Sequence, residues 1–258
     1  MTKSDIIRVV ALDDIPASVG LLTRLPMKID MEKAAARGAN GAWAYPVVGL
    51  FTGGVTALIG TLMIYLGVPI DIAAAIALAA YVIITGAMHE DGLADTADGL
   101  WGGWDAARRL EIMKDSRIGA YGVIAIAVSM LTRWLLLSYL LGTFWGACAI
   151  VMAAVISRSA MVAVMAWQPN ARDTGLSQSV GRPTGQTACI AAGIAALGTV
   201  AFGLWIAVML ALVCVAVTWI CGRIAQAKIG GQTGDILGAT QQMTEIAAGI
   251  VLVSCLAV

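Results

Sequence analysis

The sequence predicts an all-α membrane protein that crosses the bilayer several times, and its composition and long uncharged runs predict this class. Of its 258 residues, 60% are hydrophobic and 12% are charged, with a mean hydropathy of +0.87. Soluble domains carry about 25% charged residues. The formal net charge of +0 offers no basic surface for nucleic acid. We therefore predict one integral membrane domain over residues 1–258, with the lipid bilayer and no nucleic acid as its surroundings.

We expect about six transmembrane helices and a short C-terminal apolar tail, since a span needs roughly 20 mostly apolar residues. The first four spans are predicted at 43–66, 68–88, 121–141 and 144–167. The apolar run at 187–221 favours a hairpin of two short helices, with its bend between Gly198 and Gly203. Residues 246–258 are too few to cross alone at about 1.5 Å per residue. We interpret them as a half-span or re-entrant tail.

The charges predict the orientation of these spans. With the hairpin, every Lys and Arg except the intramembrane Arg133 and Arg158 falls on one side of the bilayer. Positively charged loops face the cytoplasm. The predicted cytoplasmic segments are the N-terminal segment 1–42 and the loops 89–120, 168–186 and 222–245. This interpretation places a multi-pass protein in the cytoplasmic (inner) membrane, with its active site at the cytoplasmic interface.

An acidic stripe follows the second predicted span. Asp91, Asp95 and Asp98 are spaced i, i+4 and i+7, so on a helix their carboxylates share one face. Like charges at this spacing destabilise a helix, whereas a bound divalent cation would reverse the sign of the interaction. Oxygen ligands favour Mg²⁺, Mn²⁺ or Ca²⁺ over zinc. We interpret the three aspartates as metal-binding and catalytic; the alternative is a polar interfacial loop whose acids face water.

Glycines accompany the acids in two places. Gly92 and Gly99 interrupt the acidic stretch, and a helical glycine suggests close approach of another backbone or a ligand. The second place is the segment 230–238, where Gly231 and Gly234 could bring backbone N–H groups to phosphate oxygens and Asp235 could add a metal ligand. No Lys-Ser or Lys-Thr follows, so this is not a Walker A loop. The alternative is a flexible turn.

Basic side chains near the acids would complete a diphosphate site, because Arg and metal-bound carboxylates together bind such a group. The candidates are Arg108, Arg109 and Arg117 after the acidic stripe, with Arg172 and Arg182 in the next loop. Taken singly, each is better explained by the positive-inside pattern. Arg133 and Arg158 are different, since a charge within a span needs a buried partner or a substrate anion. His89, the sole histidine, is a candidate general base or a hydrogen-bonded interfacial residue.

At these motifs the chain resembles the cobalamin synthase family, the adenosylcobinamide-GDP ribazoletransferases. The matching segments are Thr-Arg-Leu-Pro at 23–26, Tyr-Pro-Val-Val-Gly-Leu at 45–50, the Asp-Gly-Leu-Ala-Asp-Thr-x-Asp-Gly core at 91–99, Leu-Glu-Ile-Met-Lys-Asp-Ser-Arg-Ile-Gly at 110–119, Ser-Arg at 157–158 and Gly-Gly-Gln-Thr-Gly-Asp-x-Leu-Gly-Ala at 230–239. The resemblance implies a Mg²⁺-dependent transferase that joins adenosylcobinamide-GDP to α-ribazole or its 5′-phosphate and releases GMP. It also makes other enzymes of cobalamin assembly candidate partners. Cofactor-binding roles for Arg108, Arg109, Arg117, Arg158, Gly231 and Gly234 and a Mg²⁺ site at Asp91, Asp95, Asp98 and Asp235 fit this chemistry.

Two rival interpretations remain at this stage. The segment from Asp95 to Gly99 resembles the opening of the CDP-alcohol phosphatidyltransferase motif, but the Ala-Arg and the later aspartates of that motif do not follow. A transporter would also explain charges within spans. Transporters bind substrate near the bilayer midplane, whereas here the acids gather at one interface. The sequence leaves the oligomeric state open.

Overall fold

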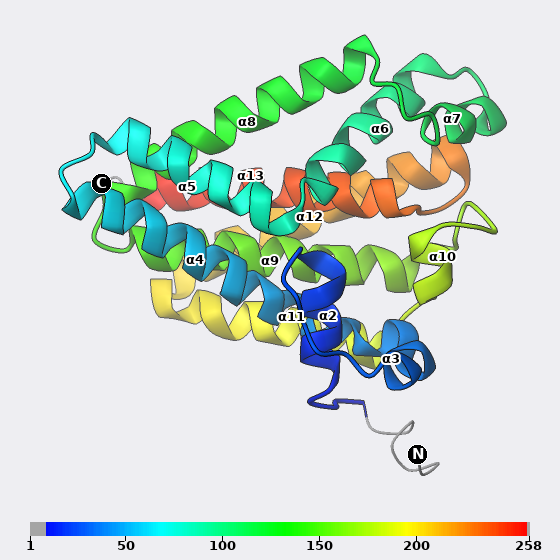
Figure 1. Cartoon of the computed structure of the whole chain (residues 1–258), viewed down its shortest axis with the longest axis horizontal. Helices are drawn as coiled ribbons and strands as arrows, with labels where there is room; N and C mark the ends of the chain where they lie inside the picture. The colour runs from blue at the N-terminus through cyan, green and yellow to red at the C-terminus, as the bar shows by residue number, and fades with distance from the viewer. Residues whose placement is uncertain (1–8, 257–258) are drawn as a thin grey trace.

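The computed structural model describes residues 9–256, a bundle of long helices lying side by side along its long axis (Figure 1). The elements are α2 (Asp14–Leu22), α3 (Met31–Arg37), the 3₁₀ helix η1 (Gly38–Ala44), α4 (Tyr45–Tyr65), α5 (Ile70–Thr85), α6 (Met88–Gly102), α7 (Ala106–Ile112), α8 (Ala120–Leu141), α9 (Gly146–Trp167), α10 (Leu176–Val180), α11 (Gly185–Thr199), the 3₁₀ helix η2 (Val200–Phe202), α12 (Leu204–Ile229) and α13 (Gly234–Leu256). No β-strand occurs among the described residues. The predicted all-α class is confirmed.

Six helical segments in the described part of the chain are long and apolar enough to cross a membrane. They are 31–65, 120–141, 146–167, 185–202, 204–229 and 234–256. The pair α5 and α6 meets the same test together but is bent by 85° between the two helices. The bend runs through Gly86 (φ +65°) and Ala87 (φ +56°). Both have left-handed backbone conformations, which residues other than Gly, Asn and Asp seldom adopt.

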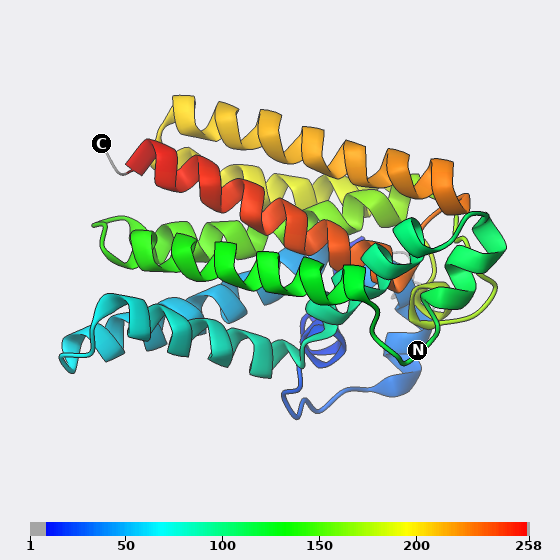
Figure 2. The same cartoon turned by 90° about the horizontal axis from the view of Figure 1, so that it is seen from above.

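The predicted hairpin within 187–221 is confirmed. α11 ends at Thr199, η2 follows, and Gly203 with φ +90° begins the turn into α12. The two helices run in opposite directions along the bundle (Figure 2). The second helix is longer than expected, because α12 continues to Ile229.

The expected C-terminal tail at 246–258 is wrong, and so is the loop expected at 222–245. Residues 234–256 form one helix, α13, and the intervening turn spans only 230–233. Hydropathy hides this helix because its middle carries Gln241, Gln242 and Glu245, which hydrogen-bond to one another and to neighbouring helices. Buried polar groups are tolerated when they are paired in this way. Similarly, much of the loop expected at 89–120 is helical, since it contains α6 and α7.

The helix connections separate into two ends of the bundle (Figures 1 and 2). One end holds the turns at 66–69, 142–145 and 200–203, which contain no Lys or Arg. The other end holds α3, α7, α10 and the turn at 230–233, with the basic residues of the loops. The predicted segregation of charge to one end therefore holds. Of the N-terminal segment 1–42, residues 1–8 lie outside the described residues, as do 257–258 of the tail.

Helix α9 is the central element, and its side chains are buried along most of its length. It packs closely against α4 because α4 presents glycines at the contact: a Cβ added to Gly53 would lie 2.8 Å from Val151 Cα, and one added to Gly49 would lie 2.8 Å from Val155 Cα. Small residues allow this kind of close approach between membrane helices. The tight α4–α9 pair supports one side of the cavity described next.

Candidate active site

Helices α6 and α13 cross at two glycines, backbone against backbone. A Cβ on Gly92 would lie 3.0 Å from the Asp235 carbonyl oxygen, and one on Gly238 would lie 3.3 Å from the His89 carbonyl oxygen. A side chain at either position would press on the facing backbone, so glycine allows the two helices to lie at this spacing. The close backbone approach predicted for Gly92 and Gly99 is confirmed at both, since a Cβ on Gly99 would lie 3.0 Å from the Arg109 carbonyl oxygen of α7.

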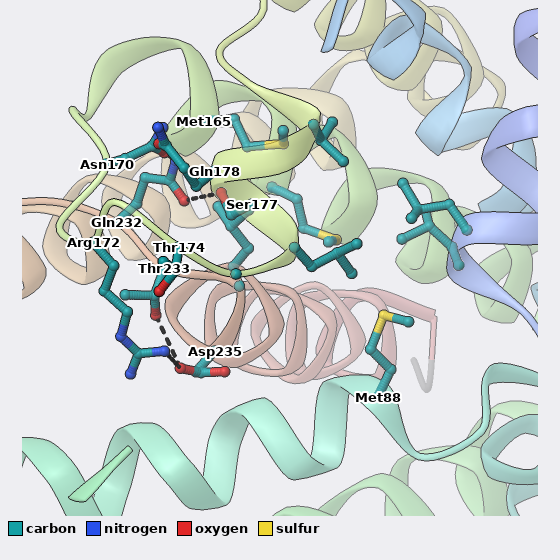
Figure 3. Close-up of a pocket in the computed structure, with 18 of the residues that line it drawn as sticks. Met88, Met165, Asn170, Arg172, Thr174, Ser177, Gln178, Gln232, Thr233 and Asp235 are labelled. Carbon is teal, nitrogen blue, oxygen red and sulfur yellow. Dashed lines mark hydrogen bonds and ion pairs between the residues drawn. The ribbon is translucent and has the colours of Figure 1, made fainter. Parts of the chain in front are cut away.

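A cavity of about 180 Å³ lies beside this crossing, between α6, α9, α10 and the start of α13 (Figure 3). Asp91 and Asp235 both line it, although 144 positions separate them in sequence (235 − 91). The prediction that these two acids share one end of the protein is confirmed. Polar side chains of the loop before α10 and of the 230–233 turn line the cavity together with the apolar side chains of Met88, Met161 and Met165.

Negative charge exceeds positive charge in this region. The half-buried Asp95 lies one turn beyond Asp91 and is repelled by the carboxylates of Asp235, Asp91 and Asp98, while Arg172 offsets part of this repulsion. Arg172 places Nη1 3.2 Å from Asp235 Oδ2 and also donates to the Leu110 carbonyl. Among residues 9–256, no three His, Cys, Asp or Glu side chains are close enough to hold a metal ion between them. The carboxylate oxygens nevertheless provide the donor type that Mg²⁺ prefers.

Asp98 has a different local role. Both of its carboxylate oxygens accept backbone N–H groups, from Gly119 at 2.7 Å and from Gly122 at 2.9 Å, at the start of α8. A side chain on Gly122 would collide with the carboxylate. Asp98 thus satisfies unpaired donors at a helix N-terminus, and it does not line the cavity.

His89 is fully buried and is absent from the cavity lining. Its ring nitrogens have no hydrogen-bond partner among the described residues, and the charges of Arg158 and Arg133 act on it. The structure therefore places this predicted base in the interior of the bundle. It does not bring the imidazole to Asp91 and Asp235.

The arginines that follow the acidic stripe are engaged elsewhere. Arg108 pairs with Glu111 at 2.7 Å, and the 87% exposed Arg117 pairs with Asp115 at 2.7 Å. Arg109 donates to the carbonyls of Gly103, Trp104 and Lys228 and so ties α7 to the end of α12. None of the three lines the cavity.

The two intramembrane arginines belong to a buried network. Arg133 of α8 pairs with Glu90 at 2.6 Å and with Glu245 at 3.1 Å, which names the partners that sequence could not. Arg158 of α9 donates to Tyr81 Oη at 3.1 Å, and Tyr81 in turn donates to Glu245 at 2.6 Å. Arg158 has no exposed surface and does not line the cavity.

The cavity also contains polar residues that sequence reasoning did not single out. Ser177 donates to Gln232 at 2.6 Å (Figure 3), and Gln232 also bonds to Asn170, which bonds to Gln178. Backbone bonds between 169–171 and Gln232 hold the loop against the 230–233 turn. The signal available in the sequence was the density of hydrogen-bonding side chains in two loops of an otherwise apolar chain.

The predicted phosphate-binding glycines differ in their surroundings. Gly231 packs against the Pro169 carbonyl and leaves no room for a Cβ, so its small size serves the contact between the loops. Gly234 is the first residue of α13, lines the cavity and has open space where a side chain would be. The N-terminus of a helix favours anions, so Gly234 and Asp235 lie where a metal–phosphate group would meet this end of α13.

Comparison with known proteins adds independent information. The family model described as cobalamin-5-phosphate synthase matches residues 14–253. An adenosylcobinamide-GDP ribazoletransferase of Bradyrhizobium diazoefficiens is 42% identical over 90% of each chain. Enzymes of the same name from Mesorhizobium japonicum and Shewanella pealeana are 41% and 36% identical, over 93% and 91% of this chain and 92% of each relative. No solved structure matches the chain.

Proposed function

The chain belongs to the cobalamin-5-phosphate synthase family, and from this premise we propose that its cavity is the Mg²⁺-dependent active site of the family's transfer reaction. The family membership makes it a transferase of cobalamin synthesis, like the ribazoletransferases it resembles. Adenosylcobinamide-GDP and α-ribazole or its 5′-phosphate are its proposed substrates. The relatives named above carry the name of a ribazoletransferase and so do not favour the CDP-alcohol phosphatidyltransferase or the transporter interpretation.

The observation that carries this proposal is the meeting of Asp91 and Asp235 in one cavity with Arg172. We propose that Asp91, Asp95 and Asp235 hold Mg²⁺; Asp98 is left out because both its oxygens bind the backbone of α8. When bound, the metal would neutralise charge on the diphosphate and on the departing GMP.

The protein groups have defined tasks in this scheme. Arg172 releases Asp235 and binds a phosphate group of the substrate instead. The two N–H donors of a guanidinium can bind two oxygens of one phosphate. The start of α13 stabilises the anionic phosphate through its N–H groups. The ribazole hydroxyl attacks the phosphorus attached to cobinamide and releases its proton to water, while the phosphoanhydride bond breaks and GMP leaves with the bonding electron pair. Positioning and charge stabilisation supply most of the catalysis of such a transfer.

A test compares substitutions of two proposed metal ligands with the substitution of a nearby acid that has no such role. Asp95→Asn and Asp235→Asn should lower Mg²⁺-dependent GMP release by about 100-fold or more, with the protein still present in the membrane. Asp173→Asn is the matched control, because Asp173 is exposed beside Arg172 in the same loop but does not line the cavity. Wild-type turnover by Asp95→Asn and Asp235→Asn, or full activity in the presence of a chelator, would refute the metal site.

The cytoplasmic location of the site is part of the proposal. It is supported by the segregation of Lys and Arg to the cavity end of the bundle. A cysteine introduced at the exposed Thr174 should react with an impermeant maleimide in inverted inner-membrane vesicles and stay unlabelled in intact spheroplasts. The opposite pattern would place the cavity on the outer side. The label should be read at the new cysteine alone, because Cys148 and Cys189 are also exposed.

A further inference from the structure

We propose that Arg133 is a positioning residue that clamps α6 to α13 and thereby sets the spacing of the carboxylates in the cavity. This inference rests on the proposed function, because it assigns the clamp to the same metal site. It concerns a group inside the bundle that does not itself line the cavity.

One guanidinium joins three helices. From α8, Arg133 Nη1 lies 2.6 Å from Glu90 Oε1 of α6, and Nη2 lies 3.1 Å from Glu245 Oε1 of α13. Nη1 also donates to Gln242 of α13 at 3.1 Å. The planar guanidinium fixes the directions of its donors, so α6 and α13 are held at defined positions relative to each other.

The two clamped helices are those that carry the proposed metal ligands. Glu90 immediately precedes Asp91, yet Glu90 is buried towards Arg133 while Asp91 is exposed and lines the cavity. Neighbouring residues of a helix point about 100° apart. Holding Glu90 inside the bundle therefore fixes the rotation of α6 that turns Asp91 outward.

A second fixed point makes the geometry complete. The helices touch backbone to backbone at Gly92 and Gly238, between the clamp and the cavity. A single contact would leave their crossing angle free to change. The glycine crossing and the Arg133 clamp together fix this angle, and Ser129 of α8 adds a bond to Gln242 at 2.9 Å.

The form of the contact supports a positioning role. Arg133 and Glu90 are both almost completely buried, and a buried ion pair is seldom more stabilising than apolar packing of the same volume. The ion pair instead fixes the orientation of α6 relative to α8 and α13. Arg133 also lies 4.8 Å from the centre of the Tyr81 ring, so its position is restricted on a further side.

The test measures metal response separately from turnover. In Arg133→Lys the charge is kept but a compact ammonium cannot bridge two helices in the same way. The Mg²⁺ concentration that half-saturates GMP release should rise about 10- to 100-fold, the range seen when residues that orient metal ligands are removed. The turnover at saturating Mg²⁺ should stay close to that of the wild type. Glu90→Gln should produce a shift in the same direction.

A matched control removes a different buried ion pair. Asp14→Asn breaks the contact with Arg37 at 2.5 Å, which is equally buried but joins α2 to α3. It should leave the half-saturating Mg²⁺ concentration unchanged. An unchanged metal response in folded Arg133→Lys would overturn the clamp, and so would a loss of turnover without any change in metal response.

Direct measurements separate this inference from the proposed function. Mn²⁺ binding without substrate, followed by electron paramagnetic resonance, should weaken in Arg133→Lys. If wild-type protein neither binds Mn²⁺ nor releases GMP, the proposed function fails. The clamp is then tested by the distance between spin labels at Trp101 of α6 and Ile250 of α13, which are both exposed. A broader distance distribution in Arg133→Lys supports the clamp, and an unchanged one refutes it.

Discussion

The cavity and the buried network beneath it use the same side-chain types with opposite charge balance. At the cavity end of α6 and α13, Asp91, Asp95 and Asp235 lie near one another, while Arg172 pairs with Asp235 and offsets part of the repulsion on Asp95. In the interior, Glu90 and Glu245 are matched by Arg133 and Arg158. Balanced charges can be buried at tolerable cost, whereas unbalanced ones favour a counter-ion. The comparison indicates that the network holds the helices in place, and that the unbalanced carboxylates at the cavity favour a positively charged ligand.

The largest expected effect on stability comes from removing one acid of the buried network, in which Glu90 and Glu245 are matched by Arg133 and Arg158. Glu90→Gln leaves Arg133 with less compensation in a buried site, so the free energy of unfolding should fall by about 3 kcal/mol or more. Steric trapping or unfolding in mixed detergent measures it. Asp115→Asn is the surface control, because the Asp115–Arg117 pair is largely exposed and such pairs contribute little. A Glu90→Gln protein as stable as the wild type would contradict the assignment of the network to the fold.

The next effect tests the contact that joins the two regions. Gly238→Ala introduces a methyl group where 3.3 Å separates a Cβ from the α6 backbone, and overpacking of this kind costs about 1–3 kcal/mol. The variant should lose stability and bind metal more weakly. Gly193→Ala on α11 has nothing within 4 Å and should be neutral or slightly stabilising. Equal behaviour of the two variants would contradict the close crossing.

A smaller effect separates Asp98 from the other aspartates. Asp98→Asn retains one acceptor and loses charge at the start of α8, so it should cost about 1 kcal/mol of stability. Its half-saturating Mg²⁺ concentration should remain that of the wild type. A large rise would show that Asp98 binds the metal after all.

The smallest effect is expected to have the opposite sign. In the absence of metal, Asp91→Asn removes one of the like charges that act on Asp95, and it should raise stability by about 0.2–0.5 kcal/mol. Addition of Mg²⁺ should stabilise the wild type more than this variant, as ligand binding to the folded state requires. Thermal unfolding with and without Mg²⁺ measures both. A marked loss of stability in Asp91→Asn would show that Asp91 belongs to the buried network of paired charges.

Sequence predicts most of the fold because hydropathy reports helices whose outer faces contact lipid. It predicted the hairpin at Gly198–Gly203 and the segregation of charge. It missed α13 because the polar middle of that helix is hidden among other helices, and pairing between distant residues cannot be read from one stretch of chain. A single span can therefore look like a loop when its polar face is buried.

The site was predictable where its chemistry is local. The acidic stripe at Asp91 and Asp95 and the glycine-rich turn before Asp235 were predicted to share one end of the bundle, and the structure places Asp91 and Asp235 in one cavity. The separation of Glu90 from Asp91 was not visible, because adjacent acids look alike until a helix turns them to different surroundings. The engagement of Asp98 by Gly119 and Gly122, and the loop contacts of Gln232, depend on tertiary structure and could not be inferred.

The crossing at Gly92 and Gly238 also has a consequence for biogenesis. A ribosome-bound chain that has been translated as far as α12 already contains α6 but has neither Asp235 nor the helix that closes the cavity. Under the proposed function, catalytic competence is then acquired only when α13 inserts and docks against a helix made more than a hundred residues earlier. An incomplete chain in the membrane would lack one of the proposed metal ligands.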